Sequence, residues 1–200
     1  GLVLVGAPSV PAKNFGELLG WVKSHPGTVS YASYTAGTLS HVLGLQLNKA
    51  AGIDMTHVGY KGSTPALTDV MGGHVPLMFD AMPSSLPLVK AGKIKAFAVS
   101  TPKRSALLPE VPTFTELGYP QLEATGWMGL WIKPDVPAAQ QARVREAALK
   151  VLAMPSVRER LQDIGFEPGQ PRSPEELAKS HSADYQRMGS VLKSIDFKPE

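Results

Sequence analysis

Short runs of β-forming residues alternate with stretches of helical spacing through the first hundred residues, and this alternation restricts the fold more than any other feature. The β-rich runs cover residues 28–33, 54–60, 75–80 and 94–100. Each of the first three is followed by small or polar residues and then by apolar residues at helical spacing. Strands that alternate with helices of this length predict βαβ units and a mostly parallel sheet. The sequence therefore indicates an α/β fold.

The ends of several elements are also marked in the sequence. The apolar opening "GLVLVGAPSV" predicts a strand. The helix after the first β-rich run should cover residues 38–51 with Gly52 as its C-cap, and Gly72-Gly73 should end the next helix. Residues 101–121 contain four prolines and little periodicity, which predicts a linker or a surface excursion.

The last third of the chain is rich in helix. A β-like stretch at 123–132, whose Trp127 and Trp131 are expected to pack in the interior, precedes helices at about 138–153 and 156–164. Another helix is expected at about 174–195, where Ser173 and Glu176 have the spacing of a capping box. Helices with one apolar stripe need a partner surface. Either they pack on the first sheet, or the sheet of their own lobe is missing from this chain.

Composition excludes several classes of function. The formal charge of +3 is too sparsely distributed for a phosphate-backbone track, so no nucleic acid is expected. The absence of cysteine excludes disulfides, thiol catalysis and cysteine–metal sites, and no apolar run is long enough to span a membrane. No motif for a nucleotide, a metal or a nucleophilic serine occurs, so neither a cofactor nor a metal is expected. Ser40 and His41 are adjacent on a helix, where they diverge too far to act as a pair, and the other histidines have no ligand spacing.

Glycines and hydroxyl groups gather where the predicted helices begin. In "YASYTAGTLSH", residues 31–41, a glycine and several hydroxyls precede a helix whose N–H groups attract anions. Thr38 or Ser40 could instead simply cap that helix. The loop "YKGSTPA" has the same form, with Lys61 as either a charge partner or a solvated lysine. Asp80 ends the third strand, where it either accepts from a ligand or caps the next helix. Three such loops at one sheet edge predict a small-anion site.

At these residues the chain resembles the solute-binding receptors of tripartite tricarboxylate transporters, the Bug family. The resemblance includes residues 31–80, the segment "AGKIKAFAVSTPKRSALLPEVPTFTELGYP" and the segment "EATGWMGLWIKP". It implies a type II periplasmic-binding fold that closes like a flytrap over a small carboxylate, without catalysis, and membrane permease subunits as partners. The ligand could be a di- or tricarboxylate, an amino acid or an aromatic acid. The ligand-binding residues that follow from the resemblance and from the loops are Ser33, Tyr34, Thr35, Gly37, Thr38, Tyr60, Lys61, Gly62, Ser63, Thr64, Asp80 and Thr125. Family members commonly have Ala-Gly in place of Tyr34-Thr35, so we expect Tyr34 to contact the body of the ligand.

The family normally has a further segment before Gly1, with a signal peptide and strands of the first lobe. We therefore expect a periplasmic protein in which residues 5–121 form one complete βα lobe. Residues 122–200, together with hinge strands at 1–4, should form the helix-rich C-terminal part of a second, incomplete lobe, in a fragment or a shortened paralogue. Two alternatives stay open. One is a hydrolase or transferase that uses His41 or Asp80, and the other is the effector-sensing domain of a transcription regulator.

Overall fold

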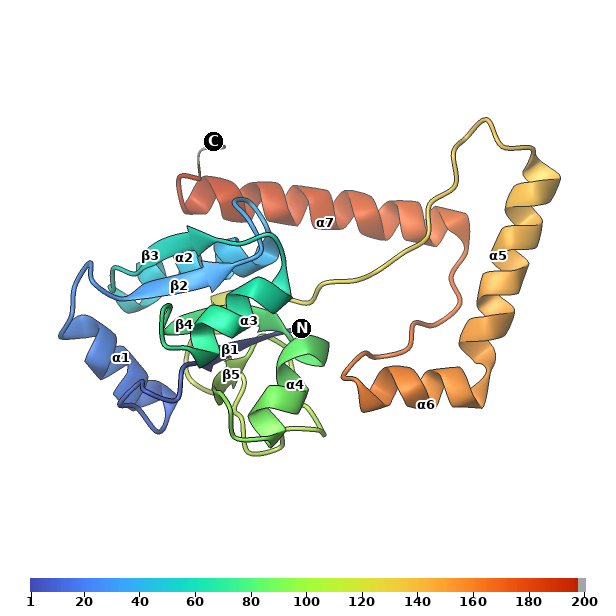
Figure 1. Ribbon diagram of the computed structural model, residues 1–200. Helices are drawn as coiled ribbons and strands as arrows, with labels where there is room; N and C mark the ends of the chain where they lie inside the picture. The colour runs from blue at the N-terminus through green and yellow to red at the C-terminus, as the bar shows by residue number, and fades with distance from the viewer. Residues whose placement is uncertain (198–200) are drawn as a thin grey trace. The chain divides into compact units, whose positions relative to one another are not determined.

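The computed structural model describes residues 1–197, which form two compact units. Unit 1 comprises Gly1–Gly126 together with the C-terminal residues from Met188, and unit 2 comprises Trp127–Arg187. Unit 1 contains one five-stranded sheet, with the strand order β3-β2-β4-β1-β5 (Figure 1). The strands are β1 (Leu2–Gly6), β2 (Ser30–Ser33), β3 (Thr56–Gly59), β4 (Leu77–Ala81) and β5 (Lys95–Val99).

The strand directions differ in one respect from the expected parallel sheet. β2 pairs in parallel with both β3 and β4, as expected for successive βα units. β1 runs antiparallel to its neighbours β4 and β5, and so interrupts the parallel order. All five residues of β1 are buried, which fits the inner position of a continuous apolar run. The predicted N-terminal strand is thus confirmed, and it belongs to the sheet of unit 1.

Four helices and a 3-10 turn accompany the sheet of unit 1 (Figure 1). The predicted helix at 38–51 is confirmed as α2, and Gly52 closes it in the left-handed conformation at φ 60°. Helix α1 was not expected, although Asn14 caps it through a bond from Glu17 N to Asn14 Oδ1 of 2.9 Å. The sequence Asn-Phe-Gly-Glu is the signal that could have revealed it. The elements are α1 (Phe15–Lys23), α2 (Leu39–Ala51), α3 (Ser63–Met71), α4 (Met82–Lys90) and η1 (Pro120–Leu122).

The core of unit 1 extends beyond the sheet. Aromatic rings at its centre include Tyr31 and Phe79, which are both fully buried. The proline-rich segment 101–121 is more than a linker or a surface excursion, because its Leu108, Val111 and Phe114 are buried in the same core. Apolar residues spaced without a helical or strand period gave no sign of this packing.

Unit 2 contains α5 (Ala138–Ala153), α6 (Pro155–Asp163) and most of α7 (Pro174–Ser194), which confirms the three predicted helices. The capping box also forms, with Ser173 N donating to Glu176 Oε2 and Glu176 N donating to Ser173 Oγ. None of the residues in these helices is buried.

The β-like stretch at 123–132 is not a strand, so this prediction is wrong. Trp127 and Trp131 are 51% and 70% exposed, and the prediction that they pack in the interior is also wrong. Within residues 1–197 no strand pairs with this stretch, and its apolar side chains therefore have no sheet to cover them. The indole N–H of Trp127 donates to Asp184 Oδ2 at 2.9 Å.

The compact units differ from the predicted domains at both ends of the chain. Residues 2–4 belong to β1 in the sheet of unit 1, and the described residues from Met188 onward also lie in unit 1. The boundary inside the chain falls after Gly126, close to the expected position after residue 121. Within residues 1–197, no helix combines the length and the apolar character that crossing a membrane requires.

Candidate functional site

Three loops meet at one edge of the sheet in unit 1, where the parallel strands β2, β3 and β4 end. Helices α2, α3 and α4 start after these strands, as Figure 1 shows. Two hydrogen bonds connect the loops through Asp80 Oδ1, which accepts from Tyr34 Oη at 2.8 Å and from Ser63 Oγ at 2.7 Å. We call residues 33–41, 60–66 and 80–85 the three-loop edge. The predicted convergence of these loops is therefore present in the fold.

Asp80 is held by hydroxyl groups. Its side chain is completely buried, and Ser85 Oγ donates to its second oxygen, Oδ2. Neither ion pair found within residues 1–197 involves Asp80. The start of α4, one residue after Ala81, carries a partial positive charge that favours a carboxylate at this point. Asp80 thus has protein partners on both oxygens, and its carboxylate has no surface open to a ligand.

Tyr34 covers Asp80 from the loop after β2. Its hydroxyl donates to Asp80 and accepts a hydrogen bond of 2.6 Å from the backbone N–H of Ala81, the residue that precedes α4. Burial, followed by the charge of Asp80, raises the pKa of Tyr34 well above its usual value of 10. The phenol therefore stays protonated at neutral pH and remains a donor to Asp80.

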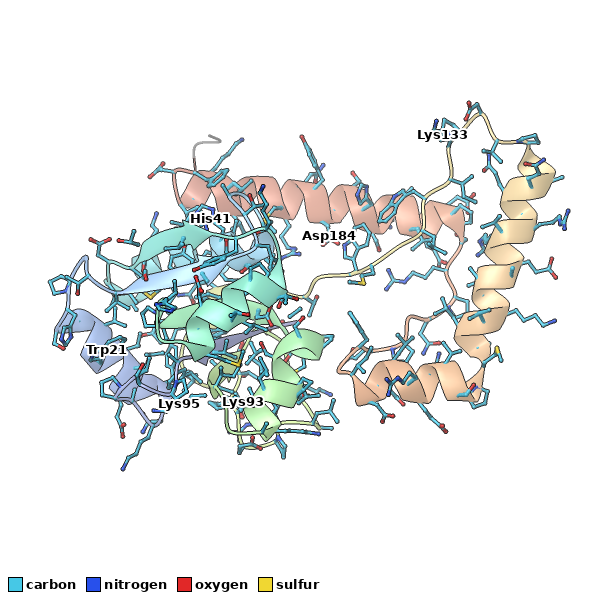
Figure 2. All side chains as sticks on the ribbon, in the orientation of Figure 1. Trp21, His41, Lys93, Lys95, Lys133 and Asp184 are labelled. Carbon is cyan, nitrogen blue, oxygen red and sulfur yellow. The ribbon has the colours of Figure 1, made fainter. Side chains whose placement is uncertain are left out.

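The structure brings together two histidines that the sequence analysis did not connect. The rings of His41 and His57 stack with centroids 3.7 Å apart and an interplanar angle of 17°. Ser33 Oγ lies 2.6 Å from His57 Nε2, and Gly37 N donates to His41 Nδ1 at 3.1 Å. No local sequence pattern indicated this contact, because it depends on the parallel pairing of β2 with β3, in which His57 lies opposite Tyr31. Figure 2 labels His41 among the side chains of this region.

None of the three helices has a side-chain cap at its N-terminus. The cap residues are Thr38 for α2, Gly62 for α3 and Ala81 for α4. Thr38 Oγ1 donates backwards to Thr35 O at 2.8 Å, and Ser40 Oγ donates to Phe79 O. Thr38 therefore occupies the N-cap position of α2, but neither its hydroxyl nor that of Ser40 makes a capping hydrogen bond.

The open donors of the edge lie mainly at α3. Thr35, Lys61 and Thr64 are exposed, and within residues 1–197 none of their side chains has a hydrogen-bond or ion-pair partner. The backbone N–H groups of Ser63 and Thr64 likewise donate to no acceptor in the described part of the chain. Gly62, which precedes them, has a φ of 109°, a conformation that favours glycine.

Other predicted site residues are occupied or lie outside the edge. Ser33 is buried and bound to His57, and Gly37 is exposed with its N–H bound to His41. Tyr60 donates to Asp69 Oδ2 of α3 at 2.7 Å, and burial together with this bond raises its pKa to about 12. Thr125 is exposed, and within residues 1–197 no hydrogen bond joins it to the three loops.

The arrangement is suited to holding an anion and poorly suited to catalysis. Ser33 and His57 are close enough to form a nucleophile–base pair, but Ser33 is completely buried, so a substrate carbonyl cannot reach its oxygen. Within the described residues, no group of three or more His, Asp or Glu side chains has the arrangement of a metal site. Two surface depressions, of about 240 and 390 Å³, are lined by residues outside the three-loop edge. The three-loop edge is an exposed surface that carries hydrogen-bond donors.

The chain is similar to receptors of one transporter family. The profile of the tripartite tricarboxylate transporter family receptor matches residues 1–197. The UPF0065 protein in the TAR-I ttuE-ttuC' intergenic region of Agrobacterium vitis is 33% identical over 193 residues, which are 96% of this chain and 56% of that protein. The chain thus spans little more than half of that relative.

Solved structures show the same likeness. The structure of a periplasmic transporter is 38% identical with a TM-score of 0.91, over 96% of this chain and 64% of that one. MatC from Rhodopseudomonas palustris, solved with bound malate, is 30% identical with a TM-score of 0.88, over 96% of this chain and 66% of its own. Because the family profile covers residues 1–197, the chain belongs to the tripartite tricarboxylate transporter receptor family.

Proposed function

We propose that this protein captures a small carboxylate outside the cytoplasm and delivers it to the membrane permease subunits of a tripartite transporter. The observation that carries the proposal is the meeting of three helix N-termini at one sheet edge, none with a side-chain cap. Uncapped N-termini present N–H donors and partial positive charge, which together favour an anionic group. Malate in MatC, which has a similar fold, supports a carboxylate as the anion.

The donors for this anion are neutral groups at the start of α3 and in the loop after β2. The N–H groups of Ser63 and Thr64 and the hydroxyl groups of Thr35 and Thr64 have no acceptor within residues 1–197. Lys61 is exposed beside them and adds long-range attraction for an anion. Each charge-assisted hydrogen bond contributes roughly 1.5–3 kcal/mol. A micromolar ligand needs about 8 kcal/mol after an association cost of about 4–15 kcal/mol has been met, so the donors of this edge are too few and a second set must contribute.

The length of the relatives agrees with this need. The chain covers 64% and 66% of the two solved structures described above. We expect the additional residues in a full-length receptor to supply a second set of hydrogen-bond donors opposite this edge and to exclude water from the carboxylate. Equal affinity of the 200 residues and of the full-length protein for the same acid would contradict this expectation.

The test is a calorimetric titration of the full-length protein with a panel of mono-, di- and tricarboxylates, after a thermal-shift screen. We expect at least one acid to raise the melting temperature in proportion to the logarithm of its concentration. Thr64→Val, which removes only a hydroxyl group, should weaken the binding of that acid by about five- to tenfold. Thr56→Val is the matched control, because Thr56 is exposed at the opposite end of β3. A panel without any binder, or equal losses in both variants, would refute the proposal.

A further inference from the structure

Asp80 is the one acidic side chain at the end of a strand in the three-loop edge, and it has the chemistry to bind a cation. A carboxylate offers about four acceptor positions, and an ammonium group is a strong donor to it. In this structure three of those positions accept hydroxyl groups, from Tyr34, Ser63 and Ser85. The side chain has no exposed surface.

Tyr34 differs from the other two donors in what it covers. Ser63 and Ser85 are small and belong to the first turns of α3 and α4. Tyr34 comes from the loop after β2, and its hydroxyl binds both Asp80 Oδ1 and the N–H of Ala81. One phenol thus satisfies the acid and the amide at the entrance of α4, and its half-buried ring packs against the core beside them.

We infer that Tyr34 makes this receptor select acids that lack an ammonium group, since its phenol takes the position at Asp80 that a ligand's ammonium would need. The inference rests on the proposed function of carboxylate capture at the same edge. A ligand meets an aromatic surface here, and an ammonium group placed against it loses hydration without gaining a carboxylate partner. The preferred ligands are therefore carboxylates without an amino group, in place of amino acids.

Matched pairs of acids test this selection in the full-length protein. Each pair differs only in a 2-amino group: succinate and aspartate, glutarate and glutamate, propanoate and alanine, 3-phenylpropanoate and phenylalanine. For every pair that binds, we expect the wild-type protein to bind the member without nitrogen at least about tenfold more tightly. In Tyr34→Ala, which uncovers Asp80, the ratio of the affinities for the two acids should shift toward the amino acid by about tenfold or more.

Two further variants distinguish the covering of Asp80 from a general loss of stability. Tyr34→Phe keeps the ring over Asp80, so it should lower the melting temperature and leave the affinity ratio unchanged. Tyr119→Phe removes a hydroxyl from another half-buried tyrosine, which packs on Phe15 with ring centroids 5.6 Å apart, and it should change neither quantity. A wild-type protein that binds both members of a pair equally would overturn the inference, even where Tyr34→Ala does not fold. So would an unchanged ratio in folded Tyr34→Ala. If no acid in the panel binds, the proposed function itself fails, which is a different result from lost discrimination.

Discussion

Gly44 of α2 lies directly against the ring of Tyr31 on β2. A Cβ added to Gly44 would be 2.0 Å from Tyr31 Cε2 and 2.2 Å from Cζ. Tyr31 is fully buried and its hydroxyl donates to His41 O at 3.1 Å, so the ring cannot move aside cheaply. Gly44→Ala should therefore lower the free energy of unfolding by about 1–3 kcal/mol, despite the better helix propensity of alanine. Chemical denaturation measures this change.

Gly20 provides the matched control for this substitution. It lies inside α1, is exposed, and a Cβ added there would have no heavy atom within 4 Å. Gly20→Ala should raise the free energy of unfolding by roughly 0.5–1 kcal/mol, because alanine favours the helix and restricts the unfolded chain. A stabilised Gly44→Ala protein would show that helix propensity outweighs the contact with Tyr31.

The buried carboxylate of Asp80 should contribute more to the free energy of unfolding than either surface ion pair found within residues 1–197. Ser85→Ala removes the donor to Oδ2, and we expect a loss of about 1–3 kcal/mol in the free energy of unfolding. Asp80→Ala should cost more, because it leaves three hydroxyl groups without their acceptor. Ser84→Ala is the control: within the described residues the Ser84 hydroxyl has no hydrogen-bond partner, so its loss should stay within about 0.5 kcal/mol. Equal effects of Ser84→Ala and Ser85→Ala would contradict this account.

The loops at the sheet edge show how far sequence reasoning extends. The C-terminal end of α2 follows from a local signal, its closing Gly52, and agrees with the structure. Asp80 was located correctly at a strand end, but its partners come from positions 34, 63 and 85, and no local pattern joins them. Contacts across parallel strands depend on strand order, which alternation alone does not specify.

The strand predicted at 123–132 is absent for a different reason. Its alternation of apolar and small residues is a real β signal, but a strand also needs a neighbour to accept its hydrogen bonds, and residues 1–197 provide none. Sequence reasoning also missed that β1 would be antiparallel, since a single apolar run carries no information on direction.

Tyr60 should ionise late in an alkaline titration. Its pKa is raised from 10.0 to about 12, first by burial and then by the hydrogen bond to Asp69. The folded state therefore favours the protonated phenol. Its contribution to stability is complete below pH 10 and is lost as the pH rises toward about 12. The ultraviolet absorbance of tyrosinate measures the ionisation, and the difference between wild type and Tyr60→Phe should show one step near pH 12. A difference step at pH 10 would mean that Tyr60 is neither shielded from water nor bound to Asp69.

Hydrogen exchange should separate the two units of the 200-residue chain. All residues of β1 are buried inside a sheet, whereas α5 and α6 contain no buried residue. Local opening is easiest where few apolar contacts are lost, so amides of β1 should exchange at least about a hundredfold more slowly than those of α5 and α6. Trp127 and Trp131 give an independent measure in unit 2, because side chains 51% and 70% exposed should be readily quenched by acrylamide. Equal protection of β1 and α5, measured by mass spectrometry of peptides, would contradict the burial described for these elements.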